Sequence, residues 1–327
     1  MTPGPSPVVE IRDLRTHLVT RWGTLKAVDG VSFTVGAGET LGLVGESGSG
    51  KSMTCLTIVR LVPRPAARIV GGSVRLDGEE LLDKSEPEMQ RIRGRKVAMI
   101  LQDPMSSLNP VFSIGMQIRE TVAMYHRLRG RSLSTRAAEL LAAVRIPSPA
   151  TRLRAFPHQL SGGMRQRVVG AMAIAAPPRL LIADEPTTSL DLTIQAQYLT
   201  LLEELQERHG LAMIFITHNL GIVSRICDRV AVMYAGRIVE MGPVRQIFRT
   251  PAHPYTRALL ESIPRLGVRP DRLTAIEGQP PDMAGLGPGC AFAPRCPHAM
   301  ERCRVEAPPE VVVAPGQVSR CWLHATA

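Results

Sequence analysis

A glycine-rich loop between an apolar strand and a helix constrains the fold of this chain more than any other feature. The loop Gly45-Glu-Ser-Gly-Ser-Gly-Lys-Ser52 matches the pattern G-x-x-x-x-G-K-[ST]. The apolar run Leu41 to Val44 precedes it, and residues 52–61 form a helical pattern that Pro63 stops. Strand, loop and helix in this order predict a phosphate-binding unit on a parallel sheet.

The residue types of this loop suit a nucleotide phosphate. Glycines let backbone N–H groups approach phosphate oxygens, and the following helix directs its positive end at the same anion. Lys51 is expected to reach the β- and γ-phosphates, and Ser52 to ligate Mg²⁺. The expected nucleotide-binding residues of the loop are Gly45, Glu46, Ser47, Gly48, Ser49, Gly50, Lys51 and Ser52.

Two carboxylates end another apolar strand. Asp184 and Glu185 follow the run Leu180 to Ala183. In a sheet that carries a phosphate loop, Asp184 is placed to hold Mg²⁺ through water, and Glu185 to orient or deprotonate the attacking water. Helix capping or simple surface charge is the alternative interpretation of such a pair.

The remaining pattern predicts an α/β fold with a mainly parallel core sheet. Further strands are expected at residues 96–101, 179–183 and 211–216 with helical patterns between them. Helices without strands, at 115–128 and 134–144, indicate a helical subdomain inserted at about 103–165. We expect an ATPase domain over 1–250 and a compact, loop-rich extension over 251–327, where Pro and Gly become frequent.

The composition indicates the cellular compartment but does not identify the class of binding partner. The 327 residues carry a formal net charge of +10, which suits nucleic acid, anionic lipid or nucleotide phosphates equally. No apolar run approaches the roughly 20 residues that cross a bilayer, and the N-terminus lacks a signal-peptide pattern. We therefore expect a cytoplasmic protein that keeps its six cysteines reduced.

A third motif narrows the class of nucleotide hydrolase. Leu160-Ser-Gly-Gly-Met-Arg-Gln-Arg167 resembles the signature sequence of ATP-binding cassette (ABC) proteins and, as in that family, stands shortly before the acidic strand. Ser161 before two glycines and an apolar helical run is also a plausible N-cap that leaves amide groups open to an anion. The resemblance implies that Ser161, Gly162 and Gly163 close on the γ-phosphate of ATP held by a second ATPase subunit.

Further positions match this family one by one. Trp22 resembles the aromatic residue that stacks on adenine, although a buried core Trp is the alternative. Gln102 resembles the glutamine that contacts Mg²⁺ and the attacking water. The segment Ser189-Leu-Asp191 resembles the loop that communicates between the two ATP sites. His218 resembles the switch histidine that touches the γ-phosphate.

Other segments resemble the ATPases of bacterial oligopeptide and dipeptide importers. They are the phosphate loop itself, Gln102-Asp-Pro-Met-Ser-Ser-Leu-Asn-Pro110, His253-Pro-Tyr-Thr-Arg257 and the C-terminal cysteine segment. This resemblance implies an antiparallel β subdomain, ATP and Mg²⁺ as ligands, and a position on the cytoplasmic face of the cell membrane. The implied partners are two transmembrane permease subunits, a head-to-tail sister or identical ATPase and, indirectly, a solute-binding protein.

Two other classes of function compete with transport. The basic charge permits a nucleic-acid ATPase, but the long coiled-coil insertion or second cassette typical of such proteins is not seen in the sequence. A regulatory module that uses ATP only as a switch would not require Glu185 and His218. We therefore expect no nucleic-acid partner.

Four cysteines cluster near the C-terminus, at Cys290, Cys296, Cys303 and Cys321. Four thiolates in a segment with little hydrophobic core suit a metal ion or iron–sulfur cluster that stabilises the segment. The spacing lacks the close pairs of zinc ribbons and matches neither ferredoxin pattern. The importer resemblance favours a [4Fe-4S] cluster, with Zn²⁺ and free or oxidised thiols as the alternatives.

Overall fold

A computed structural model describes residues 6–21, 23–102, 107–188, 190–263 and 275–325. Compactness divides the chain into two units that are each built from separate segments. The first unit comprises Met1–Val8, Val35–Glu39 and Asp83–Phe215, and the second comprises Val9–Thr34, Thr40–Leu82 and Ile216–Ala327. Trp22 and Ser189 lie outside the described residues. No described helix is long and apolar enough to cross a membrane.

The first unit combines buried strands with a group of helices. Its strands are β6 (Val97–Ile100), β7 (Leu180–Asp184) and, except for the last residue, β8 (Ala212–Ile216). Its helices are α2 (Glu86–Ile92), α4 (Ile114–Tyr125), α5 (Gly130–Ala143), α6 (Pro149–Arg152), the 3-10 turn η1 (Pro157–Gln159), α7 (Gly162–Ala173) and α8 (Leu192–His209). Strands β6 and β7 pair in parallel, and every residue of β7 and β8 is buried.

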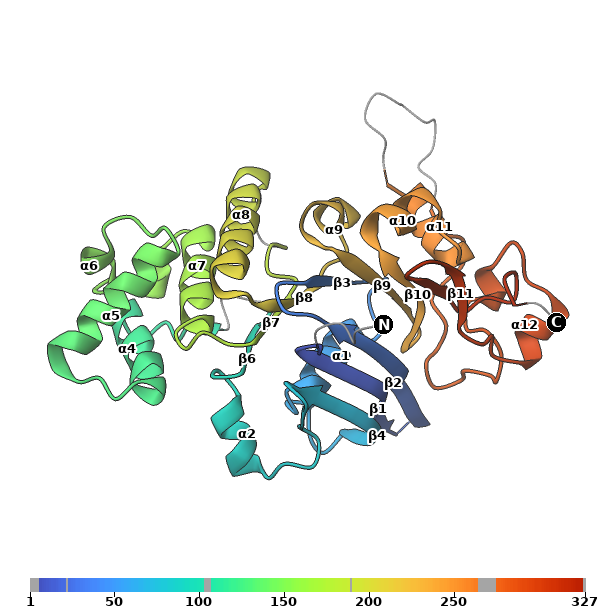
Figure 1. Cartoon of the computed structure of the whole chain (residues 1–327), viewed down its shortest axis with the longest axis horizontal. Helices are drawn as coiled ribbons and strands as arrows, with labels where there is room; N and C mark the ends of the chain where they lie inside the picture. The colour runs from blue at the N-terminus through green and yellow to red at the C-terminus, as the bar shows by residue number, and fades with distance from the viewer. Residues whose placement is uncertain (1–5, 22, 103–106, 189, 264–274, 326–327) are drawn as a thin grey trace. The chain divides into compact units, whose positions relative to one another are not determined.

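The two helices predicted for the inserted segment are present as α4 and α5, and their ends lie within one to four residues of the predicted ranges. In Figure 1 these green helices lie beside α7, and both contact it. Helix α4 turns Ile114, Ile118 and Val122 inward, at the 3.6-residue spacing of an amphipathic helix. The described part of residues 103–160 holds no strand.

The second unit contains an antiparallel sheet in the order β2-β1-β4-β5. Its strands are β1 (Val9–Thr20), β2 (Gly23–Val35), β4 (Ala67–Leu76) and β5 (Glu79–Glu80). Apolar residues alternate along β1, where Val9 and Ile11 are buried, as expected for a sheet with one covered face. This sheet is the antiparallel β subdomain that the family resemblance implied.

The same unit carries a mixed run of strands in the order β11-β12-β10-β9-β3. They are β3 (Thr40–Val44), β9 (Arg229–Tyr234), β10 (Arg237–Pro243), β11 (Val311–Ala314) and β12 (Gln317–Ser319). The β3–β9 pairing is parallel, whereas β9–β10, β10–β12 and β11–β12 are antiparallel. The fold is thus α/β with mixed sheets, and "mainly parallel" overstates the order in this unit.

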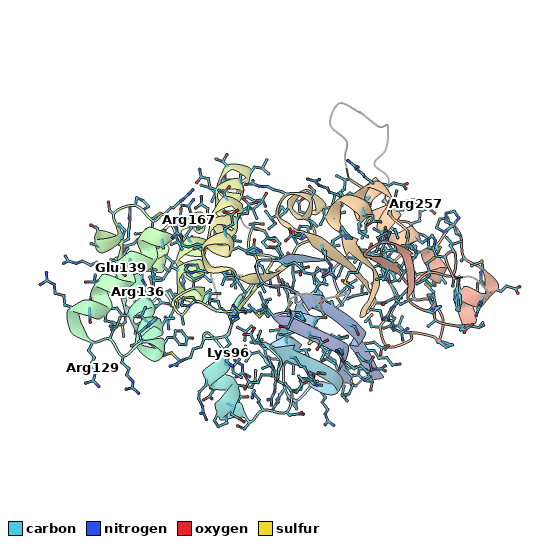
Figure 2. All side chains as sticks on the ribbon, viewed as in Figure 1. Lys96, Arg129, Arg136, Glu139, Arg167 and Arg257 are labelled. Carbon is cyan, nitrogen blue, oxygen red and sulfur yellow. The ribbon has the colours of Figure 1, made fainter. Side chains whose placement is uncertain are left out.

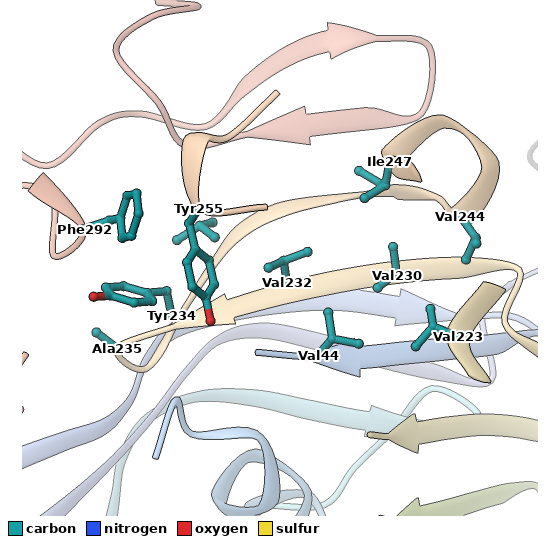
Figure 3. Packing of buried hydrophobic residues seen from close by; sticks show 11 residues of the cluster. Val44, Val223, Val230, Val232, Tyr234, Ala235, Val244, Ile247, Tyr255 and Phe292 are labelled. Atoms are coloured by element: carbon teal, nitrogen blue, oxygen red, sulfur yellow. The ribbon is translucent and has the colours of Figure 1, made fainter. Parts of the chain in front are cut away.

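The helices of the second unit are short. They are α1 (Lys51–Ile58), α9 (Leu220–Ile226), α10 (Val244–Arg249), α11 (Pro254–Glu261), the 3-10 turn η2 (Ala293–Arg295) and α12 (Glu301–Val305). A core of valines and aromatic side chains joins β3 and β9 to α10, α11 and the turn η2 (Figure 3). Residues of the C-terminal extension therefore belong to the same core as the strand before the phosphate loop.

Arginines occur on several elements of each unit. Figure 2 labels Arg129 and Arg136 at α5, Arg167 on α7 and Arg257 on α11. Arg136 pairs with Glu139 one turn away on α5, at 3.1 Å between nitrogen and oxygen. Such exposed pairs contribute little to stability and define no binding patch by themselves.

Candidate functional site

The phosphate loop has the backbone that its sequence predicted. Gly45 and Gly50 adopt φ values of +147° and +104°. A Cβ atom would lie 2.2 Å from the carbonyl oxygen of Met233 at Gly45 and 2.2 Å from that of Ala27 at Gly50. Both positions therefore require glycine for conformation and for space. Helix α1 begins at Lys51, directly after the loop.

Lys51 lies inside the loop rather than in solvent. Its side chain is buried, and Nζ donates to the carbonyl oxygens of Gly45 and Glu46, both at 2.8 Å, and to Ser49 Oγ at 3.3 Å. These acceptors fix the ammonium group at the centre of the loop. A phosphate that enters the loop meets a preplaced positive charge and the amino end of α1.

The C-terminal extension contacts this loop through two residues to which the sequence analysis gave no role. The backbone N–H of Glu46 donates to Tyr255 Oη at 2.8 Å, and the Arg295 guanidinium donates twice to the Glu46 carboxylate. The carboxylate raises the pKa of Arg295, and burial raises the pKa of Tyr255. Tyr255 stands in the quoted segment His253–Arg257 and Arg295 directly precedes Cys296, so only their neighbourhood was visible in the sequence.

The expected catalytic carboxylate lies in the first unit, at the end of β7. Asp184 is buried, and Glu185 follows it with a φ of +44°, a left-handed conformation that is rare for this residue type. Gln102 Nε2 donates to Glu185 Oε2 at 3.3 Å, and Thr188 Oγ1 donates to the same oxygen at 3.0 Å. The structure thus brings Gln102 and Glu185 together and adds Thr188, while their roles at the attacking water stay predictions.

The signature segment also lies in the first unit. Ser161 caps α7, and its Oγ accepts a hydrogen bond from Met164 N–H at 3.3 Å, which confirms the predicted N-cap. Gly162 faces open space, whereas a Cβ at Gly163 would lie 2.4 Å from Ile194 Cγ2. Gly162 therefore leaves room for a ligand at the helix start, and Gly163 permits the close packing of α7 against α8.

Asp191 and His218 both lie close to the start of a helix. Asp191 Oδ1 accepts from the N–H groups of Thr193 and Ile194 at the start of α8, a capping contact that the sequence analysis did not predict. His218 is exposed after β8, one residue before the N-cap Asn219 of α9. His218 and the phosphate loop belong to the second unit, while Gln102, Asp184 and Glu185 belong to the first.

The four C-terminal cysteines are free thiols in neighbouring positions. Cys290 N–H donates to the carbonyl oxygen of Cys303 at 2.7 Å. Burial raises the pKa of Cys290 and that of Cys296, and it raises the pKa of Cys321 to about 11, with smaller contributions from the other thiols of the group. Among the described residues no three His, Cys, Asp or Glu side chains lie close enough to hold a metal ion. The thiols as arranged here do not form a ready ligand set.

The other two cysteines have the expected environment. Cys55 in α1 is fully buried, and burial raises the pKa of Cys227. Cys227 is partly buried and packs against the core cluster that contains Val223 and Val230. Both behave as small apolar side chains, as predicted.

Comparison with known proteins places this arrangement in a family. Residues 28–188 match the family model "ABC transporter", and residues 239–303 match "Oligopeptide/dipeptide transporter, C-terminal region". A dimeric solved structure of the ATP-binding cassette MJ0796 bound to ADP and Pi superposes with a TM-score of 0.65 at 25% identity. It covers 72% of this chain and 99% of that one. The chain therefore belongs to the ABC transporter family and is an ATPase that binds ATP with Mg²⁺.

Two curated relatives indicate the subgroup of ABC proteins to which this chain is similar. The chain is 49% identical to the probable peptide ABC transporter ATP-binding protein y4tR of Sinorhizobium fredii, over 98% of this chain and 96% of that one. It is also 49% identical to the putative peptide import ATP-binding protein BMEII0863 of Brucella melitensis, over 96% of each chain. Within the ABC family the chain thus falls among the ATP-binding proteins that carry the oligopeptide/dipeptide transporter C-terminal region.

Proposed function

We propose that this chain is the ATP-hydrolysing subunit of an importer for dipeptides, oligopeptides or related small solutes. The observation that carries the proposal is the likeness to peptide-import ATP-binding proteins over nearly the whole chain, C-terminal region included. The segments on which the importer resemblance was built lie mostly within these matched ranges.

The predicted site residues divide the tasks of hydrolysis among them. Lys51 binds the β- and γ-phosphates. Ser52, Gln102 and Asp184 would hold Mg²⁺, which would neutralise phosphate charge. Glu185 orients the attacking water and accepts its proton, and Gln102 holds the Glu185 carboxylate in place. His218 contacts the γ-phosphate. Support comes from the buried Lys51 and from the constrained Glu185.

A second ATPase subunit completes the site in this proposal. Ser161, Gly162 and Gly163 of one subunit close on the γ-phosphate held by the other, while Trp22 stacks on adenine. The capped start of α7 and the open space beside Gly162 support this role, and the similar cassette MJ0796 forms a dimer. A sister chain and a second copy of this chain are both candidates for the partner.

Permease subunits are the remaining partners. We propose that the helical subdomain docks two transmembrane subunits at the cytoplasmic face of the membrane, so that closure of the ATPase pair opens the permease outward. Exposed apolar side chains on α4 and before it suit such docking, namely Val111, Phe112, Met116 and Met124. A solute-binding protein acts on the far side.

A [4Fe-4S] cluster at Cys290, Cys296, Cys303 and Cys321, with Zn²⁺ as the alternative, is a separate proposal. The support is the presence of four cysteines in one C-terminal segment and the backbone hydrogen bond that joins Cys290 to Cys303. In the described residues the side chains do not yet form a metal-binding group, so the proposal requires them to converge. No step of hydrolysis depends on this group. Iron, zinc and acid-labile sulfide measured per chain after anaerobic purification distinguish cluster, zinc and unliganded thiols.

Replacement of one carboxylate tests the hydrolytic role. Glu185→Gln keeps the shape of the side chain but cannot accept a proton, so we expect Mg²⁺-dependent ATPase activity to fall about 100-fold or more. The variant should also form an ATP-dependent dimer in size-exclusion chromatography. Glu207→Gln, at an exposed position of α8, is the matched control. Equal activity in Glu185→Gln and the original chain would remove Glu185 from this role and favour an ATP-operated switch.

A further inference from the structure

The phosphate loop is held from outside by the C-terminal region. Arg295 Nη1 donates to Glu46 Oε2 at 2.7 Å, and Nη2 donates to Glu46 Oε1 at 3.0 Å. Tyr255 Oη accepts the backbone N–H of Glu46 at 2.8 Å. The side chain and the backbone of one loop residue are thus both fixed by the C-terminal region. A fork-to-fork pair of this kind fixes direction as well as distance.

Arg295 is itself firmly positioned. It lies in the 3-10 turn η2, and its side chain is only 5% exposed. Its Nε donates to the carbonyl oxygen of Glu277 at 2.9 Å, and its Nη1 lies 3.3 Å from Tyr234 Oη. The guanidinium also lies against the rings of Tyr234 and Phe292. Because so many partners fix the guanidinium, the Glu46 carboxylate has little freedom to turn elsewhere.

Tyr255 has an equally defined place. Its ring packs against Tyr234 and Phe292, with centroids 4.6 and 5.3 Å away (Figure 3). His253 Nδ1 accepts the Tyr255 N–H at 3.0 Å and so caps the helix that carries the tyrosine. The hydroxyl that receives the loop amide is therefore presented by a packed aromatic cluster.

The charge of Glu46 gives this arrangement a functional consequence. A carboxylate at the second position of a phosphate loop repels the phosphates that the loop must bind, and a partly buried pair of charges interacts strongly. Arg295 compensates that charge and holds the carboxylate against the C-terminal region. Without Arg295 the loop would keep an uncompensated negative charge.

We propose that Arg295 and Tyr255 are positioning residues for ATP, which brace the phosphate loop through Glu46 and compensate its carboxylate. The C-terminal region thereby sets the affinity of the loop for nucleotide phosphates. This inference rests on the proposed ATPase function and deepens it. Arg295 and Tyr255 need touch no substrate, because they act through Glu46.

ATPase kinetics and nucleotide binding test the inference together. For Arg295→Ala we expect KM for ATP and the Kd of a fluorescent ATP analogue to rise about tenfold, equivalent to about 1.4 kcal/mol, with kcat within twofold of the original chain. The double variant Arg295→Ala with Glu46→Ala should recover at least half of the lost affinity on a logarithmic scale, because the uncompensated carboxylate is gone. Arg295→Lys, which keeps the charge without the fork, should fall between the original chain and Arg295→Ala.

Two further variants separate a positioning role from a structural one. Tyr255→Phe keeps the ring but not the acceptor, and should raise Kd about threefold at an unchanged melting temperature. Arg320→Ala removes a C-terminal arginine that pairs with Glu310, away from the loop, and should leave Kd and KM unchanged. If Arg295→Ala does not fold, Arg295→Lys and Tyr255→Phe decide the question by the same Kd.

The inference and the proposed function fail in different ways. Suppose that the original chain hydrolyses ATP. The inference is then overturned if Arg295→Ala changes Kd and KM by less than twofold, or if the double variant binds ATP as weakly as Arg295→Ala. Either result leaves the ATPase assignment unchanged. An original chain without ATPase activity that still loses nucleotide affinity in Arg295→Ala would overturn the hydrolytic function alone.

Discussion

Two residues of this chain hold a state that costs free energy. Glu185, after the end of β7, has an unfavourable backbone conformation, and the buried His253 is kept neutral. Glu185 adopts φ +44°, and residues other than glycine rarely accept that region without compensation. His253 is 2% exposed, and burial lowers its pKa to about 3, with a smaller contribution from His324. The motif around Glu185 was recognisable in the sequence. Its left-handed backbone was not, because nothing in the residue type signals that conformation.

The buried histidine makes a prediction about stability and pH. Since the folded-state pKa lies below the unfolded value of about 6.5, the unfolded chain binds a proton that the native chain does not. This contribution to the unfolding free energy is complete above pH 6.5 and is lost as pH falls toward 3. Between pH 7 and pH 5 the original chain should lose about 2 kcal/mol more than His253→Asn.

Urea denaturation at pH 7, 6 and 5 measures this difference. Asparagine is a suitable control residue because its side-chain oxygen can still accept the Tyr255 N–H that His253 Nδ1 accepts. The two chains should therefore be most alike at pH 7 and should diverge as the pH falls, because only the original chain carries the buried imidazole. Parallel pH profiles for the two chains would show that His253 is protonated in the native state or does not titrate in this range.

Among the elements, those with a clear apolar pattern of their own were predicted well, including the buried strands β6, β7 and β8, whereas the short strands of the C-terminal tail were not. The strand, loop and helix around Lys51 are contiguous, and so are the amphipathic helices α4 and α5. Strands β11 and β12 occupy a tail expected to be loop-rich, because their order depends on pairing with β10, some 80 residues earlier. Short strands of this kind carry too little periodicity to be recognised in isolation.

Helix α7 allows its structural role to be separated from its proposed role in ATP binding. Ser161→Ala loses the cap and should destabilise the chain by about 1 kcal/mol. Ser161→Asp can still cap the helix, so its stability should match the original chain within about 0.5 kcal/mol, yet it places a negative charge where the γ-phosphate is expected. We expect its ATPase activity to fall at least tenfold. Full activity in Ser161→Asp would confine Ser161 to capping.

At the scale of the whole molecule, the C-terminal extension is tied to the phosphate loop by a chain of buried polar contacts. Gln317 of β12 donates to Glu240 of β10 at 2.7 Å, and Glu240 also accepts the N–H groups of Ala252 and His253. His253 caps α11, which presents Tyr255 to the loop. The sequence predicted a boundary near residue 250, and these contacts cross it.

Removal of one amide tests whether this connection stabilises the molecule. Glu240 is only 1% exposed, so Gln317→Ala deprives a buried carboxylate of a donor and should lower the unfolding free energy by about 2 kcal/mol. Gln317→Glu should cost more, since it sets two carboxylates side by side. Val312→Thr, at a 73% exposed position of the adjacent strand, should stay within about 0.5 kcal/mol. Urea denaturation at pH 7 measures all three. Suppose that Gln317→Ala were as stable as Val312→Thr. The apolar core around Tyr255 and Phe292 would then attach the extension by itself, and the series of polar contacts would contribute no stability.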